Sequence, residues 1–291
     1  MITESHELTR QGRAVLRLWR VCAGHEYTPN ISHRHINFEI STVISGCGEY
    51  KSGEDSYPME PGDVFVFSSS EPHCITAVGE SGLELLNLQF EPGYLAGRSH
   101  DGFSREHASI CFVHSPDFRN RIPAARAGYI SERLYGIRRE LMEQCAEYKL
   151  AIRSQTDEIM IALLRKHGYA GRESAAVRRS FPDISGALAL IDSGFTERLT
   201  LAGLAREAGL SPNYFSALFG EIYGMTPWEY VVSKRVELAE KLICEEDGCN
   251  MLDIALKCGF NNTANFNRQF KRRTGVTPTE YRRYMRGAQL W

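Results

Sequence analysis

The sequence lacks the long apolar run that a membrane-spanning helix requires. None of its apolar stretches approaches the roughly 20 residues needed to cross a bilayer. The amino terminus also lacks the charged-then-apolar pattern of a secretory signal, and the eight cysteines include no C-x-x-C pair. We therefore expect a cytoplasmic protein with reduced thiols and no membrane partner.

An excess of charge of either sign is also missing, because 34 Lys plus Arg stand against 36 Asp plus Glu. This balance alone does not indicate a nucleic-acid partner, but the distribution of charge does. Residues 183–256 carry 5 basic and 12 acidic side chains, whereas residues 257–291 carry 8 and 1. A basic C-terminal segment is the electrostatic footprint expected of a surface that meets phosphates.

A stretch of the C-terminal third occurs twice, with like residues in the same order. The first copy contains Leu204-Ala205, Ala208-Gly209, Phe215, Phe219, Gly224, Thr226-Pro227 and Glu229-Tyr230. The second contains Ile254-Ala255, Cys258-Gly259, Phe266, Phe270, Gly275, Thr277-Pro278 and Glu280-Tyr281. An apolar helix, a glycine turn and a second helix with Phe at i and i+4 indicate a helix-turn-helix, which places a helix in the DNA major groove.

The residues at the turns support this interpretation. Thr200 is a suitable cap for a helix over 201–208, and Gly209 can take the left-handed conformation that ends it. Ser211 and Pro212 then provide the N-cap and first position of the next helix. In the second copy the corresponding stop and restart residues are Gly259, Asn261 and Asn262.

An apolar stripe on the second helix of each copy predicts which side chains face DNA. The stripes are Phe215, Leu218, Phe219 and Ile222, then Phe266, Phe270 and Tyr281. The candidate DNA-binding residues are Ser211, Asn213, Ser216, Asn262, Thr263, Asn265, Asn267, Arg268, Lys271 and Arg272. Arg suits guanine O6 and N7, Asn suits adenine N6 and N7, and Thr suits the thymine methyl. The alternative, that the two copies form a helical bundle without a DNA-binding role, is the less favoured interpretation.

Residues 228–243 between the copies predict one amphipathic helix, which ends at the acidic turn 245–248. At about 1.5 Å per residue it separates the two copies by roughly 24 Å. Two helices at this separation can reach successive major grooves, about 34 Å apart, on one face of a duplex.

The segment from about 184 to 286 strongly resembles the DNA-binding domain of the AraC/XylS transcription regulators. The matching residues are Leu204-Ala205, Gly209-Leu210-Ser211, Phe215, Leu218-Phe219, Gly224, Pro227, Tyr230, Arg235, Ala239, Leu242, Ile254-Ala255, Gly259-Phe260, Phe266, Arg268, Phe270-Lys271, Gly275, Thr277-Pro278 and Glu280-Tyr281-Arg282. Family members commonly carry a basic residue where this chain has Ala217 and Gly220. The second copy is therefore expected to dominate recognition of double-stranded DNA, and RNA polymerase is a further candidate partner.

The N-terminal half predicts an antiparallel β-barrel followed by helices. Short runs rich in Val, Ile, Tyr and Phe predict strands at 15–22, 38–45, 48–52, 63–67, 73–77 and 83–90. Apolar residues at helical spacing predict two amphipathic helices, and the stripes are Ile130, Leu134, Ile137, Leu141 and Cys145, then Ile152, Ile159 and Leu163. The fold class is multidomain α+β, with a barrel at 1–124, a helical pair at 125–168, a linker at 169–182 and double helix-turn-helix domain at 183–291.

One polar constellation lies inside the predicted barrel: His33-x-His35-x3-Glu39, Gly46, Pro61-Gly62-Asp63 and Pro72-His73. On a strand, 33, 35 and 39 are separated by even steps and point to one face. The spacing resembles the first cupin motif, followed by a degenerate second one. The resemblance implies an effector-binding domain, with His33, His35, Glu39 and His73 holding a divalent metal or a polar effector such as a sugar, or merely satisfying one another.

Further polar residues on or beside these strands are candidates to line the same cavity: Arg17, Arg20, Asn37, Tyr50 and Asn87. Taken together, the patterns predict a non-enzymatic, ligand-responsive transcription regulator that forms a homodimer through the helices between 131 and 167. The alternatives are a metal-dependent cupin isomerase or oxygenase with an accessory DNA-binding domain, and a DNA-architectural protein without a ligand.

Overall fold

The computed structural model of the chain consists of two compact units. It describes residues 2–10, 13–24, 32–69, 71–96, 110–112, 114–169, 184–245 and 249–289. Residues 1–30 and 37–177 form one unit, here the sheet unit. Residues 31–36 and 178–291 form the other, here the helical unit. Each unit has its own core, so the fold class predicted from the sequence, with a β-rich N-terminal half and an all-α C-terminal part, is confirmed.

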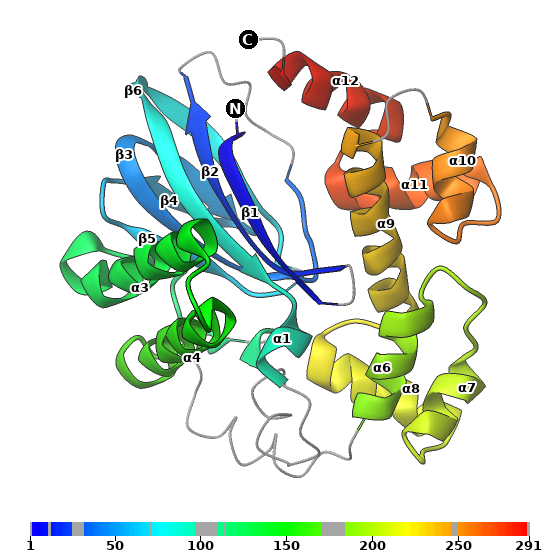
Figure 1. Cartoon of the computed structure of the whole chain (residues 1–291). Coiled ribbons are helices and arrows are strands. Elements are labelled where there is room, and N and C mark those ends of the chain that lie inside the picture. The colour runs from blue at the N-terminus through cyan, green and yellow to red at the C-terminus, as the bar shows by residue number, and fades with distance from the viewer. Residues whose placement is uncertain are drawn as a thin grey trace. The chain divides into compact units, whose positions relative to one another are not determined.

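One antiparallel sheet organises the sheet unit (Figure 1). Its strands are β1 (Ile2–Arg10), β2 (Arg13–Ala23), β3 (Phe38–Ser52), β4 (Asp55–Met59), β5 (Val64–Phe67), β6 (His73–Phe90) and β7 (Arg121–Ile122). Their order is β1-β2-β6-β3-β5-β7, with β4 paired to β3. The sequence prediction missed β1 and β4, whose residues are largely polar, and the two-residue strand β7.

Two pairs of predicted strands are single long strands in the structure. The ladder between β3 and β6 runs through Gly46 and Gly82, where the register shifts, instead of ending in turns. Both glycines have positive φ, +81° and +76°, and a Cβ on Gly46 would lie 2.0 Å from the carbonyl oxygen of Gly82. Gly46 and Gly82 are therefore β-bulge positions, at which the chain bends without leaving the sheet.

Two helices pack together beside the sheet. They are α3 (Ala124–Glu143) and α4 (Tyr148–Lys166), preceded by the short α1 (Pro92–Ala96). Their predicted stripes are buried except at Cys145, which is exposed and lies beyond the end of α3. That part of the prediction is wrong because Gln144 and Glu147 take left-handed conformations, which end α3 before Cys145 can continue the stripe.

Tyr169 extends the ordered core of the sheet unit past α4. Its side chain is fully buried, with ring centroids 5.7 Å from Phe38 and 4.9 Å from Phe118 in edge-on geometry. The sequence places Tyr169 at the first position of the predicted linker. The rest of that linker, from 170 on, lies outside the described residues, as does the predicted turn at 246–248.

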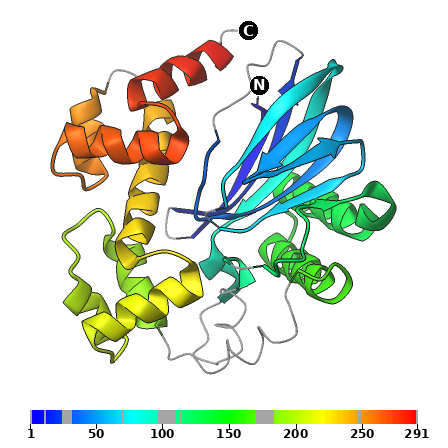
Figure 2. The same cartoon turned by 180° about the vertical axis from the view of Figure 1, so that it is seen from behind.

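The helical unit repeats one arrangement twice. Its helices are α6 (Ser185–Gly194), α7 (Leu201–Glu207), α8 (Pro212–Tyr223), α9 (Pro227–Glu245), α10 (Met251–Lys257), α11 (Thr263–Thr274) and α12 (Pro278–Gln289). We call α7–α8 the first and α10–α11 the second helix-turn-helix. The long helix α9 runs between them (Figure 2). The predicted spacer helix is thereby confirmed.

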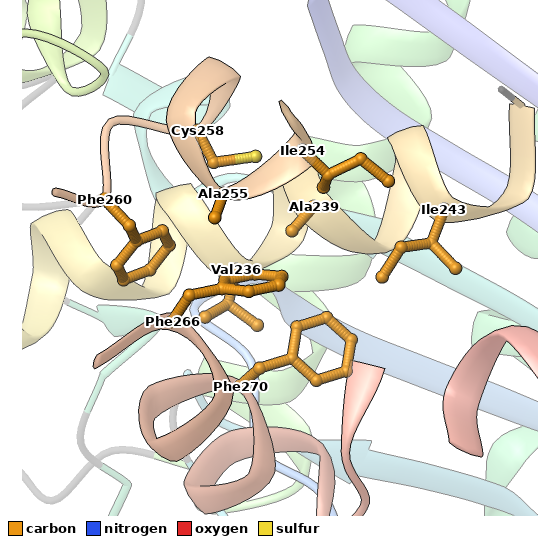
Figure 3. Close-up of a cluster of buried hydrophobic side chains, with 9 residues drawn as sticks. All are labelled: Val236, Ala239, Ile243, Ile254, Ala255, Cys258, Phe260, Phe266 and Phe270. Atoms are coloured by element: carbon orange, nitrogen blue, oxygen red, sulfur yellow. The ribbon is translucent and has the colours of Figure 1, made fainter. Parts of the chain in front are cut away.

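Apolar side chains of α9 form a common core with the second helix-turn-helix (Figure 3). The cluster consists of Val236, Ala239, Ile243, Ile254, Ala255, Cys258, Phe260, Phe266 and Phe270. Ring centroids of Phe266 and Phe270 lie 5.7 Å apart, edge to face, as the i, i+4 spacing predicts. This packing seats α11 on α9 and fixes which of its faces is left for solvent.

Candidate functional site

The turns of both helix-turn-helices are built by local hydrogen bonds that the sequence predicts. The Oγ1 of Thr200 accepts a hydrogen bond from the backbone N–H of Gly203, 3.1 Å away, and caps α7. Ser211 caps α8 by accepting from the N–H of Tyr214. Gly209, with φ +65°, ends the first helix. These caps are confirmed, and they orient α8 through interactions that need no distant residue.

The second copy uses asparagine in the same positions. The Oδ1 of Asn250 accepts from the N–H of Asp253, and the Oδ1 of Asn262 accepts from the N–H of Asn265, each at 2.8 Å. Gly259 has φ +83°. Asn262, a predicted DNA-binding residue, therefore has its side-chain oxygen engaged as the cap of α11, which leaves its amide N–H groups for a ligand.

The outward face of α8 carries little charge. Ser211 and Asn213 are exposed and Ser216 is half-buried, next to the exposed Ala217. Sequence reasoning missed Tyr214, whose side chain is 51% exposed. The sequence pattern contains a signal for this exposure, because residue 214 does not belong to the apolar stripe that begins at Phe215.

The outward face of α11 is basic. Asn267, Arg268, Lys271 and Arg272 are exposed, and Thr263 and Asn265 are half-buried. All six candidates on this helix therefore reach solvent, and four of them are fully on the surface. Three consecutive basic residues, starting at Lys271, stand in the last turn of the helix. There they also complement the negative end of the helix dipole, which is the structural alternative to a role in DNA contact.

Arg273 differs from its two neighbours. Its Nη2 donates to the carbonyl oxygen of Glu229 on α9, 2.5 Å away. Burial, partly offset by Glu237 and Glu229, lowers the pKa of Arg273 to about 10. This side chain fastens α11 to α9, whereas Arg272 is 68% exposed and lies 3.5 Å from a carboxylate oxygen of Glu229.

Glu39 and His73 come together on the sheet. Both are buried, and the Nε2 of His73 lies 3.6 Å from the Oε2 of Glu39. The Nδ1 of His73 must carry a proton, because it lies 2.9 Å from the carbonyl oxygen of Glu71, which can only accept. The imidazole also stacks on Phe67 at 4.1 Å between centroids. The Nε2 is therefore the atom that faces the Glu39 carboxylate.

The prediction that 33, 35 and 39 share one face of a strand is wrong. The strand β3 begins only at Phe38, after a bend at 36–37, and residues 31–36 group with the helical unit. The N–H of Arg34 donates to the carbonyl oxygen of Arg273, and the N–H of Ile36 donates to Oε1 of Glu237, each at 3.3 Å. These groups bond to helices rather than to a ladder, so strand alternation does not apply to them. His33 and His35 have ring centroids 5.7 Å apart.

Three polar residues share the Glu39 face of the sheet: Asn87, a candidate from the sequence, and Ser41 and Gln89, which the sequence analysis missed. The register pairs Glu39 with Gln89 and Ser41 with Asn87. Ser41 Oγ and Gln89 Nε2 donate to the two carboxylate oxygens of Glu39, at 3.1 and 2.6 Å. The sequence signal for this arrangement is the two-residue spacing of 39 and 41 and of 87 and 89, because residues two apart on a strand point to the same face.

Among the three polar residues on the Glu39 face, Asn87 has a buried side-chain atom that lacks a hydrogen-bond partner in the described part of the chain. Its side chain is 4% exposed, and its Oδ1 has no hydrogen-bond partner among the described residues. The other residues suspected of lining a cavity divide between the faces. Tyr50 packs in the apolar cluster on the Glu39 face and Arg17 pairs with Gln89 in register, whereas Arg20 lies on the opposite face, 2.5 Å from Glu84.

The carboxylate of Glu71, two residues before His73, is held by several hydrogen bonds. Glu71 accepts from the N–H of Ser68, from the Oγ of Ser52 and from the Nδ2 of Asn120, at 2.8, 2.8 and 2.7 Å. Burial alone would raise the pKa of Glu71, but the interaction with His114 and the bonds from Ser68 and Ser52 lower it to about 2. The carboxylate is thus charged and holds the loop that positions His73.

Two family models match the chain. Residues 19–164 match the AraC-like ligand binding domain, and residues 204–284 match a helix-turn-helix domain. The probable transcriptional regulator LumQ of Photobacterium leiognathi is 34% identical over 254 residues, which cover 87% of this chain and 92% of that protein. The chain belongs to the AraC family of transcriptional regulators. It therefore consists of a ligand-binding domain and a DNA-binding domain.

More distant relatives agree with this membership. The melibiose operon regulatory protein of Escherichia coli is 22% identical over 269 residues, covering 87% of this chain and 83% of that protein. The structure of ToxT from Vibrio cholerae has the same fold, with a TM-score of 0.59 at 12% identity over 93% of this chain and 97% of that one. Since the relatives are transcriptional regulators, the family favours a regulator over the cupin enzyme considered from the sequence. No helix in the described part of this AraC-family chain is long and apolar enough to cross a membrane.

Proposed function

We propose that this AraC-family regulator binds a specific DNA sequence mainly through α11 and changes that binding when a small polar molecule, such as a sugar, occupies the sheet unit. The observation that carries the DNA part is the exposed face of Arg268, Lys271 and Arg272, next to an α8 face that has no basic residue. Charged side chains on a helix seated by a buried core suit both base edges and phosphates.

The full set of DNA-binding residues proposed from the sequence is kept: Ser211, Asn213, Ser216, Asn262, Thr263, Asn265, Asn267, Arg268, Lys271 and Arg272. Arg268 is placed to contact a base, while Lys271 and Arg272 contact phosphates. Selection of bound duplexes from a random pool by the full chain tests this assignment. Recovery of the starting pool without enrichment would contradict it.

We assign the effector to the face of the sheet that carries Glu39. A buried oxygen without a partner, such as Oδ1 of Asn87, costs free energy that a ligand hydroxyl would recover by donating to it. Together with the Glu39 carboxylate it offers acceptors to a polyhydroxylated ligand. The name of the melibiose operon regulator refers to a sugar, and one ToxT structure contains an unsaturated fatty acid. The polar side chains beside Glu39, namely Ser41, Asn87 and Gln89, favour a sugar-like ligand. The neighbouring apolar cluster of Tyr50 and Phe65 is the feature that would favour a fatty acid.

The four residues His33, His35, Glu39 and His73 remain the proposed effector ligands, and also a proposed divalent metal set. Imidazole nitrogens and carboxylate oxygens together suit a transition metal, and this donor chemistry is what supports the proposed set. Elemental analysis of protein purified without chelator tests this, with His35→Ala as the matched variant. Equal metal content in the two proteins would contradict the proposed set.

We further propose that the protein is a cytoplasmic homodimer that acts together with RNA polymerase at its DNA sites. Helices α3 and α4 expose several large apolar side chains, namely Tyr129, Tyr135, Met142, Leu150 and Ile161. Self-association is one way to cover such side chains. Light scattering of the full chain at micromolar concentration should give twice the monomer mass, and a monomer mass would contradict the dimer.

A further inference from the structure

One arginine of α9 holds the loop that precedes the first helix-turn-helix. The Nε of Arg235 donates to the carbonyl oxygen of Phe195 at 2.6 Å, and its Nη2 donates to that of Glu197 at 2.9 Å. Two bonds from one guanidinium to carbonyls two residues apart restrain both the position and the orientation of this loop. The same guanidinium carbon lies 5.9 Å from the centre of the Phe260 ring, which belongs to the second helix-turn-helix.

The loop itself touches the second turn. A Cβ on Gly259 would lie 2.3 Å from the carbonyl oxygen of Thr196, so the two backbones are in direct contact there. Phe260 follows Gly259 and packs against Phe266 of α11, with ring centroids 5.3 Å apart. A continuous path therefore leads from the loop 195–197 through the second turn to the start of α11.

The neighbouring residue makes a different connection. The Nζ of Lys234 lies 2.7 Å from Oδ1 of Asp192 on α6, and the Lys234 side chain is 1% exposed. This pair ties α6 to α9 within the first half of the helical unit. Lys234 is therefore a buried basic control on the same helix, one residue away from Arg235.

We propose that Arg235 is a positioning residue that sets the separation of the two DNA segments contacted by α8 and α11. The inference rests on the proposed sequence-specific binding. Adjacent base pairs differ by about 3.4 Å and 36° around the duplex, so a specified separation requires a specified angle between the two helices. The shared helix α9 provides the distance, and the contact of the loop 195–197 with the second turn provides the angle. We call the two hydrogen bonds of Arg235 to Phe195 and Glu197 the clamp. Removing the clamp allows that angle to vary without altering any side chain on α11.

Binding-site selection with a spacer library tests the proposal. The library joins the two selected DNA segments through spacers that change in steps of one base pair. Full-length wild-type protein should prefer one spacer over its neighbours by about tenfold, an ordinary discrimination for a mismatched site. In Arg235→Met the preference should fall below about threefold, while the bases selected within each segment stay the same. Lys234→Met should lower the unfolding temperature and keep the spacer preference.

The outcomes separate a positioning role from a merely structural one. Equal loss of affinity by Arg235→Met at every spacer, with the preference intact, would overturn the proposal. If Arg235→Met does not fold, Arg235→Lys replaces it, and this variant should give an intermediate preference because it cannot bond both carbonyls in the same geometry. Full wild-type preference in Arg235→Lys would contradict the clamp. A wild-type chain that selects a sequence but no spacer overturns only this inference, whereas one that selects no sequence overturns the proposed function.

Discussion

The Nη2 of Arg268 donates a hydrogen bond to Oδ1 of Asn265, 2.9 Å away and one turn earlier on α11. The Asn265 N–H is itself bonded to the cap residue Asn262. An exposed guanidinium held in this way loses less rotamer freedom when it binds, because part of its conformation is already selected. The pair thus links the cap of the helix to the side chain proposed to contact a base.

Replacing Arg268 should therefore affect one base position, and replacing Lys271 should not. Arg268→Ala should weaken binding to the preferred site by about 1–3 kcal/mol and relax selection at a single position. Lys271→Ala should weaken binding to all sequences alike and reduce the slope of log K against log salt by about one unit. Binding titrations at several salt concentrations measure both. A larger effect of Asn213→Ala than of Arg268→Ala would reverse the ranking of the two helix-turn-helices.

A basic side chain can be added to α8 at Gly220. A Cβ at this helical position meets no atom within 4 Å. Gly220→Ala should stabilise the helical unit by up to about 1 kcal/mol through helix propensity, with no change in DNA affinity. Gly220→Lys should stabilise it similarly and also tighten binding by adding a phosphate contact. Equal DNA affinity of the Ala and Lys variants would indicate that this face of α8 does not approach the duplex.

The glycines that end α7 and α10 should differ in their tolerance of alanine. Both have positive φ, +65° at Gly209 and +83° at Gly259, which costs an L-residue about 1–2 kcal/mol. A Cβ at Gly209 meets open space, whereas one at Gly259 would clash with the Thr196 carbonyl at 2.3 Å. Chemical denaturation should show that Gly259→Ala loses clearly more stability than Gly209→Ala. Equal losses would mean that the loop and the second turn move apart easily.

Asn87→Leu should separate ligand binding from stability. The change removes a buried oxygen without a partner, so the ligand-free protein should be as stable as wild type or more stable, by about 1–3 kcal/mol. The rise in unfolding temperature that an added sugar gives the wild type should disappear. Thr42→Val, on the opposite face of β3, should keep it. Screening must include a long-chain fatty acid, and stabilisation by that compound alone would contradict a polar effector.

Glu71 should make the sheet unit sensitive to acid. Its pKa is lowered to about 2 in the folded state, so its stabilising contribution is complete above the ordinary value of 4.5 and is lost as pH falls toward 2. The contribution is of order 3 kcal/mol, since one pKa unit corresponds to about 1.4 kcal/mol. Glu71→Gln should flatten the stability profile in that window. A profile for this variant that keeps the wild-type slope would place the acid-labile group elsewhere.

The features that sequence reasoning predicted correctly depend on neighbours in the chain. Caps such as Ser211 and Asn262 bond to groups three residues away, and the Phe stripes follow the helical period, so local patterns suffice. The sequence predicts separate strands at 38–45 and 48–52 because the partner strand that makes Gly46 a bulge is far away in sequence. The segment at Arg34 was interpreted as a strand because its bonds to Glu237 and Arg273 are tertiary. Placing Asn87 with the polar side chains beside Glu39 required the β3–β6 register, which alternation in either strand alone does not provide.

Because α9 is a single helix, any change in its length moves and rotates α11 by fixed steps. Inserting one residue into it would turn the second helix-turn-helix by about 100° and advance it by 1.5 Å, which carries α11 away from the groove. Only additions near whole turns, of three, four or seven residues, would return α11 to the same side, and each would shift it by several ångströms. A chain with a longer α9 therefore fits a longer DNA site only where the added rise and rotation of the helix match those of the added base pairs, and otherwise it keeps one of the two contacts.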